Sequence, residues 1–129
     1  MSLRDEIDQF NKHICERLLE SDLEGVLDCF TDDARLLAPG SDMVRGKSSL
    51  REWWSAFMAM PLKSVSMTTD HLVLDEPERA LEIGRYQMNF ETPDGLVSDN
   101  GKYSVLFRRG EDGKIRYEVD ALNSSVPTS

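Results

Sequence analysis

The period of the hydrophobic pattern changes once along the chain, close to its middle. Up to Pro61, apolar side chains recur every three or four residues, which is the period of helices that pack one face on a core. Beyond it, segments rich in β-branched and aromatic residues alternate with turn-forming residues, which is typical of strands joined by hairpins. Because 129 residues build a single core, we predict one α+β domain in which N-terminal helices cover one face of a sheet.

The apolar spacing and the turn residues place each element. We predict helices over 3–20, 21–31 and 50–60, and a short strand over 35–38 that ends at Pro39-Gly40. Four strands are predicted over 65–75, 79–91, 96–109 and 114–123. The turns between them include Asp94-Gly95 and Asp112-Gly113, and such pairs accept the positive φ that hairpin turns require, so the four strands should form an antiparallel meander.

Charge and composition disfavour several partners. The net charge is −9 and no stretch gathers lysine and arginine between aromatic residues, so we expect no nucleic-acid partner. The charged N-terminus and the absence of a long apolar run predict a cytoplasmic protein without a membrane role. Cys15 and Cys29 lack metal-ligand spacing and are predicted to be free thiols, and with no phosphate loop or nucleophile elbow we expect neither metal nor cofactor.

Short motifs follow one another in a set order along the chain. They are Asp22-Leu23-Glu24-Gly25, Phe30-Thr31-Asp32-Asp33-Ala34, Pro39-Gly40, Trp53-Trp54, Ala80-x-Glu82-x-Gly84-x-Tyr86, Gly101-Lys102-Tyr103 and Asp120-x-x-Asn123. In this order they resemble the nuclear transport factor 2-like superfamily, and most of all its SnoaL-like and ketosteroid-isomerase-like branch. The resemblance implies a single domain over 1–123, followed by a tail over 124–129, in which a cone-shaped, curved antiparallel sheet wraps around the N-terminal helices, as in a cystatin-like α+β roll.

The resemblance also implies an apolar pocket for a small-molecule ligand and, commonly, a homodimer formed through the outer sheet face. The chain lacks the residues with which ketosteroid isomerases act, which argues against ketosteroid isomerisation itself. The general base of those isomerases precedes the proline of the first strand, where this chain has Ala38, and their tyrosine on the first helix corresponds to Ile14. Their second acid belongs to the strand segment 103–107, which contains no carboxylate.

Three residues remain as candidates for acid–base catalysis. Asp120 occupies a position where an acid recurs in the resembled branch, although a hydrogen-bonded structural aspartate is an equal alternative. Glu82 is the one carboxylate on an otherwise apolar strand face, although it could instead pair with an arginine or bond backbone at the rim. His71 is the natural proton shuttle if it points inward, but a strand histidine beside an aspartate is more often solvated.

Six further residues are predicted to contact a ligand, with a core or backbone-bonding role as the alternative for the aromatic ones. They are Trp53, Trp54, Tyr86, Met88, Tyr103 and Asn123. On the opposite sheet face we predict an apolar patch that a second copy of the chain would cover, made of Leu81, Ile83, Tyr117 and Val119.

Three functions are compatible with these features. The leading hypothesis is a pocket protein that binds a largely apolar metabolite, with isomerase-, dehydratase- or cyclase-like acid–base chemistry. The alternatives are a non-enzymatic ligand-binding module and a dimeric assembly module in which the pocket has no role.

Overall fold

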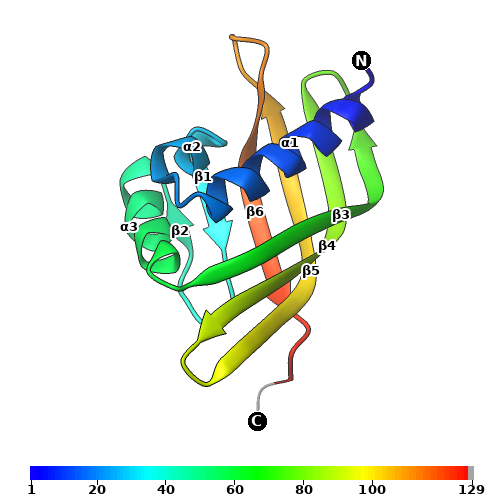
Figure 1. Ribbon diagram of the computed structural model, residues 1–129. Helices are drawn as coiled ribbons and strands as arrows, with labels where there is room; N and C mark the ends of the chain where they lie inside the picture. Colours follow the sequence, from blue (N-terminus) through cyan, green and yellow to red (C-terminus); the bar gives the residue numbers. More distant parts are fainter. Residues whose placement is uncertain (128–129) are drawn as a thin grey trace.

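The computed structural model describes residues 1–127, which form three helices and one six-stranded sheet (Figure 1). The elements are α1 (Leu3–Leu19), α2 (Leu23–Leu27), β1 (Phe30–Leu37), β2 (Val44–Arg45), α3 (Lys47–Met58), β3 (Leu62–Asp75), β4 (Arg79–Thr92), β5 (Gly95–Arg109) and β6 (Ile115–Ser124). The strand order is β2-β1-β6-β5-β4-β3. The α+β cone predicted from the sequence is confirmed.

Strands β3 to β6 form the predicted antiparallel meander, and the hairpin glycines Gly95 and Gly113 adopt φ of 115° and 81°. The sheet is mixed rather than wholly antiparallel, because β1 pairs in parallel with β6. Strand β1 enters the sheet from α2 and not through a hairpin from β6, so its direction is free of the constraint that a tight turn imposes. The two-residue strand β2 then pairs with the outer side of β1 and was not predicted.

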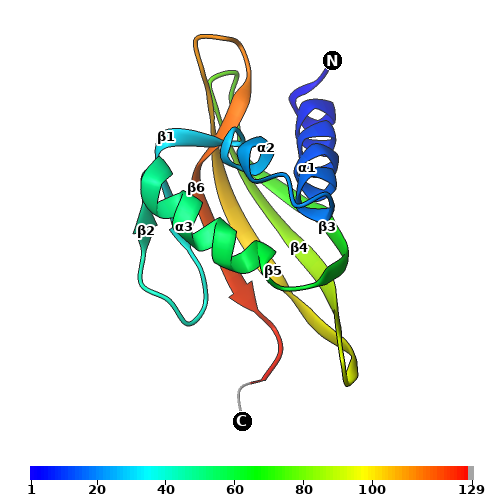
Figure 2. The ribbon, with the colours of Figure 1, turned by 60° about the vertical axis from the view of Figure 1, so that its left-hand side comes forward.

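The helices lie on the inner side of the curved sheet (Figure 2). Helix α1 begins where the Ser2 hydroxyl accepts a hydrogen bond from the backbone N–H of Asp5, as its sequence predicts. It buries one stripe of side chains, including Ile7 and Ile14, against the sheet. Within residues 1–127 no helix is long and apolar enough to cross a membrane.

The second helix is shorter than predicted. Its N-cap is Asp22, whose carboxylate accepts the backbone N–H of Gly25, while Ser21 occupies the joint with a positive φ of 54°. The chain leaves the helix before Phe30, because Phe30 pairs with Tyr117 of β6 and is completely buried there. Segment 30–31 therefore belongs to a strand, not to the predicted helix.

A β-bulge in β6 changes which residues face the core. Phe107 of β5 pairs with Tyr117 and Leu106 pairs with Val119, so Glu118 is an extra residue between them. The bulge shifts the alternation by one position, and both Tyr117 and Asp120 are buried on the inner side. The prediction that Tyr117 lies on the outer face is therefore wrong.

The last strand extends one residue beyond the predicted boundary and includes Ser124. After it, the backbone N–H of Ser125 donates to the carbonyl of Asn100, so the beginning of the predicted tail is attached to the sheet. Thr128 and Ser129, at the end of that tail, lie outside the described residues.

Candidate functional site

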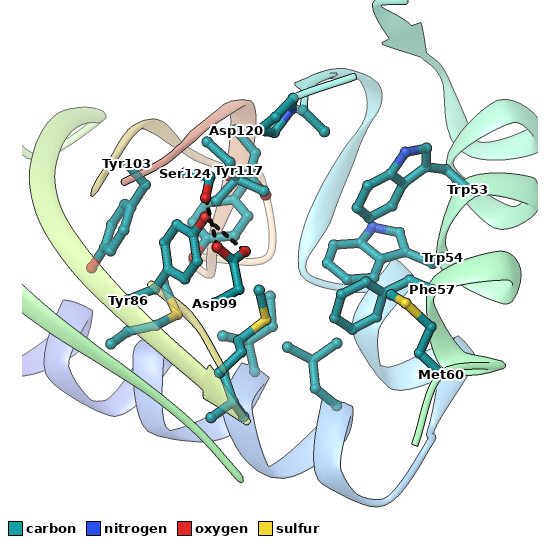
Figure 3. A pocket seen from close by; sticks show the side chains of 18 residues that line it. Trp53, Trp54, Phe57, Met60, Tyr86, Asp99, Tyr103, Tyr117, Asp120 and Ser124 are labelled. Atoms are coloured by element: carbon teal, nitrogen blue, oxygen red, sulfur yellow. Dashed lines mark hydrogen bonds between the residues drawn. The ribbon is translucent and has the colours of Figure 1, made fainter. Parts of the chain in front are cut away.

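A cavity of about 280 Å³ lies between the inner face of the sheet and the helices (Figure 3). Helix α1 contributes Ile14 and Leu18 to its wall, and α3 contributes an aromatic cluster. The volume is close to the lower end of the range for pockets that hold small molecules, and the wall is mainly aliphatic and aromatic with a few polar groups. This composition suits a compact, largely apolar ligand.

The aromatic wall comes from three residues within about one turn of α3, Trp53, Trp54 and Phe57. Trp54 is 5% exposed and its ring packs against Phe30 and Phe57, with centroids 6.0 and 5.3 Å away. Trp53 is half-buried and stacks on Phe57 with an interplanar angle of 14°. Both tryptophans line the cavity, so the pair that the sequence places in the core also forms one of its walls.

The facing wall depends on two tyrosines that each lie opposite a glycine of the neighbouring strand. Tyr86 of β4 pairs with Gly101 of β5, and Tyr103 of β5 pairs with Gly84 of β4. A Cβ atom at Gly84 would stand 2.5 Å from Tyr103 Cζ, and one at Gly101 would stand 2.8 Å from the Tyr86 ring. Each ring therefore occupies the space that a side chain at the opposite position would fill.

Asp120 is the most unusual group in this wall. It is 5% exposed, and within the described part of the chain its carboxyl has no hydrogen-bond partner. Burial, and then the negative charge of Glu82, raise its pKa from 3.8 to about 7. Asp120 and Glu82 flank Val105 in one row across the sheet, which places their strands two spacings, or roughly 10 Å, apart.

Two neutral donors that line the same cavity are also without partners among residues 1–127. They are the indole Nε1–H of Trp54 and the hydroxyl of Tyr117, both buried. Burial raises the pKa of Tyr117 far above its usual value, so its hydroxyl keeps its proton. An unpartnered buried donor costs free energy unless a ligand accepts from it, so these groups are suited to contact a bound molecule.

Glu82 is completely buried, but it lies behind the cavity wall and not in it. Its Oε2 atom accepts hydrogen bonds from Tyr103 OH at 2.6 Å, Thr69 Oγ1 at 2.6 Å and Asn11 Nδ2 at 3.0 Å. These bonds join α1, β3 and β5 to β4. The carboxylate thus holds Tyr103 in place and acts on Asp120 through its charge.

The other candidate residues divide into two groups. Met88 and Tyr103 line the cavity together with both tryptophans, Tyr86 and Asp120. His71 on β3 and Asn123 on β6 are exposed and are not part of the lining. Ser124, the residue after Asn123, lines the cavity instead.

Asp99 is a cavity residue that the sequence did not single out. Tyr86 OH donates to its Oδ2 at 3.2 Å, and Ser124 Oγ donates to its Oδ1 at 2.6 Å (Figure 3). Burial and the charge of Asp99 raise the pKa of Tyr86 to about 12, so the phenol keeps the proton that it donates. Counting back by twos from Tyr103 along β5 reaches Gly101 and then Asp99, and this alternation was the available signal.

The lining carries two carboxylates, and no lysine, arginine or histidine of residues 1–127 belongs to it. In the same part of the chain no group of three or more histidine, cysteine, aspartate or glutamate side chains could hold a metal ion. The chemistry that this arrangement offers is therefore proton exchange at Asp120, with neutral donors beside it.

Comparison with known proteins agrees with this architecture. Residues 11–118 match the family model described as the SnoaL-like domain. A ketosteroid isomerase-like protein from Erwinia carotovora atroseptica superposes with a TM-score of 0.82 at 15% identity, over 94% of this chain and 95% of that one. A nuclear transport factor 2-like superfamily protein from Salmonella enterica gives a TM-score of 0.78 at 13% identity, over 97% and 92%.

A third similar structure holds a ligand. The protein from Catenulispora acidiphila, solved in complex with S-DNPA, gives a TM-score of 0.79 at 21% identity, over 95% of this chain and 92% of that one. At these identities the solved structures establish the fold alone. No curated protein matches the sequence.

Proposed function

The chain belongs to the SnoaL-like domain family, and from this premise we propose that its cavity binds a small, largely apolar molecule with which Asp120 exchanges a proton. The fold is typical of small-molecule binding proteins and of isomerase- and cyclase-like proteins. Because one fold hosts many activities, the proposal rests on the site and not on the likeness.

The observation that carries the proposal is the position of Asp120. It is a buried carboxyl without a hydrogen-bond partner among the described residues, in the wall of an otherwise largely apolar cavity. With its pKa raised to about 7, the group is present in both protonation states near neutral pH, which is the condition for efficient general acid–base catalysis. Asp120 is 5% exposed, so little water reaches its carboxyl.

The reaction that we propose is not ketosteroid isomerisation. Ala38 and Pro39 line the cavity where the resembled isomerases have their base, and Ile14 lines it where they have a tyrosine. Proton abstraction with enolate stabilisation needs a base and a donor at those places. Here the proposed proton carrier is Asp120 on β6, and the proposed hydrogen-bond donor to the ligand is the hydroxyl of Tyr117, three residues earlier in the same strand.

Proton exchange with 2-tetralone tests both parts of the proposal. This ketone is compact, apolar and neutral, and its α-protons are replaced by deuterium in D₂O when a base abstracts them, which proton NMR measures. We expect the protein to accelerate the exchange, Asp120→Asn to abolish the acceleration, and Asp94→Asn, which removes the same charge from an exposed turn, to preserve it.

A second pair of variants tests where the ketone binds. Met88→Trp fills part of the cavity and should stop binding and exchange, whereas Met43→Trp, at an exposed methionine, should change neither. Binding without any accelerated exchange would refute the acid–base part and leave a passive binder. No binding at all, or exchange that survives Asp120→Asn, would refute the role given to Asp120.

We also propose that the protein is a cytoplasmic homodimer formed through the outer sheet face. Ile83 on β4, a member of the apolar patch predicted for that face, is 40% exposed, and an exposed apolar patch is often covered by a symmetric partner. Cys15 and Cys29 are buried free thiols, as a reducing compartment allows. Light scattering decides the assembly, since a mass of 14.7 kDa at micromolar concentration would show a monomer.

A further inference from the structure

We propose that the ligand carries a positively charged amino group and that Asp99, in the part of the cavity wall shared with a neighbouring hollow, binds it while Asp120 stays free for proton transfer. This inference rests on the proposed function, because it names the ligand class of the same cavity. It follows from the place of Asp99, from the bonds that hold it, and from the charges of the lining.

Asp99 lies where two hollows meet. It lines the cavity, and it also lines a neighbouring apolar hollow of about 400 Å³ that includes Phe90 and Val97. Phe57, Met60 and Met88 are shared by both hollows in the same way. A molecule that extends out of the cavity toward the second hollow would therefore pass the carboxylate of Asp99.

The carboxylate is held in place and still has acceptor capacity. Tyr86 OH from β4 and Ser124 Oγ from β6 each donate to a different oxygen of Asp99, which is on β5. A carboxylate offers about four lone-pair positions, so two hydroxyl donors leave about two of them free. Because three strands fix the group, a ligand donor meets a preoriented acceptor.

The charges around the ligand favour a cation over an anion or a neutral molecule. Both ionisable acids in the wall, Asp99 and Asp120, oppose an anion, and no basic side chain within residues 1–127 lines the cavity to offset them. The net charge of −9 attracts cations and repels anions at longer range. The rings of Tyr86 and Phe57 line the same space as Asp99, and the face of an aromatic ring attracts an ammonium group.

The two acids are in different environments, which suits two different roles. Asp120 is almost fully buried and its carboxyl has no hydrogen-bond partner among residues 1–127, whereas Asp99 is half-buried and its carboxylate accepts hydrogen bonds from two hydroxyls. A pair of carboxyls in such contrasting surroundings commonly divides into a proton carrier and a fixed charge. The apolar body of the ligand would then lie against the tryptophans, with its amino group toward Asp99.

Three probes that share one ring system test the inference. They are 2-aminotetralin, which is an ammonium ion at pH 7.5, the neutral 2-tetralol, and the anionic tetralin-2-carboxylate. Because a charged hydrogen bond is stronger than a neutral one, calorimetry should show the amine binding about tenfold more tightly than the alcohol. We expect the carboxylate to show no binding.

Variants assign the preference to one residue. Asp99→Asn should make the affinities for amine and alcohol equal, while Asp94→Asn, at an exposed turn, should keep the difference. Asp120→Asn should also keep the preference for the amine although it stops 2-tetralone exchange. Thermal melts confirm that each variant is folded.

The outcomes separate this inference from the proposed function. If the alcohol or the carboxylate binds as tightly as the amine, or if the preference persists in Asp99→Asn or disappears in Asp120→Asn, the inference is wrong, while 2-tetralone exchange still supports the proposed function. If none of the three probes binds and 2-tetralone is not exchanged, both are wrong.

Discussion

Replacing Asp120 by asparagine should stabilise the protein at neutral and alkaline pH and leave its stability almost unchanged in acid. In the folded protein the pKa of Asp120 is about 7, against 3.8 for an unperturbed carboxyl. Between these two values the unfolded chain releases the proton while the folded chain retains it. The native state then binds more protons than the unfolded state, so the free energy of unfolding falls as pH rises through this window.

The magnitude follows from the size of the shift. A difference of roughly three pKa units, at 1.36 kcal/mol per unit, corresponds to about 4 kcal/mol. Below pH 3.8 both states are protonated and the term vanishes, and above pH 7 it is constant. Asparagine has nearly the same shape and does not titrate, so the stability difference between Asp120→Asn and the parent should grow from near zero at pH 4 to about 4 kcal/mol at pH 8.

Urea denaturation at one-unit steps from pH 4 to pH 8 measures this difference through the midpoint and slope of each curve. Asp94→Asn is the matched control, because Asp94 is exposed in the turn between β4 and β5 and the same side-chain replacement there removes no buried carboxyl. A difference that stays constant across this pH range would show that Asp120 has an ordinary pKa in solution, and the argument for its role as proton carrier would fail.

Three other predictions concern the same site. Trp54→Ala should lower stability by about 3–5 kcal/mol, because the buried ring leaves a cavity, and Trp53→Ala should cost less; equal denaturation midpoints would contradict the assigned burial. Glu82→Gln should lower the pKa of Asp120 but not to its usual value, since burial is the larger cause of the shift. Carbon NMR titration of the Asp120 carboxyl measures this pKa, and an unchanged pKa in the variant would contradict the prediction. A Δ5-3-ketosteroid should not be converted faster than in buffer, because the isomerase base and hydroxyl are replaced by apolar side chains.

The regular parts of the sheet could be predicted because their signals are local. The alternation along β4 placed Glu82 and Tyr86 on one mostly apolar strand face, and both side chains are buried. The turn sequences at Asp94-Gly95 and Asp112-Gly113 placed two hairpins, since their glycines adopt the positive φ that such turns need. Each of these signals depends only on neighbours in the sequence.

The errors arise where pairing between segments distant in the sequence determines the secondary structure of a residue or the sheet face to which it points. Phe30 fits the apolar stripe of a helix as well as a strand, and its contact with Tyr117 of β6 makes it a strand residue. The bulge at Glu118 has no special residue type to mark it, yet it reverses the facing of Tyr117 relative to the simple alternation. Asp99 could have been found from the alternation along β5, because no bulge separates it from Tyr103.

The two tyrosine–glycine pairs between β4 and β5 support both acids of the cavity wall. Tyr86, opposite Gly101, donates to Asp99, and Tyr103, opposite Gly84, donates to the Glu82 carboxylate whose charge raises the pKa of Asp120. Since side chains alternate with a period of two, a one-residue slip between these strands would separate each tyrosine from its glycine. The register that shapes the cavity therefore also sets the charges and donors that a ligand meets in it.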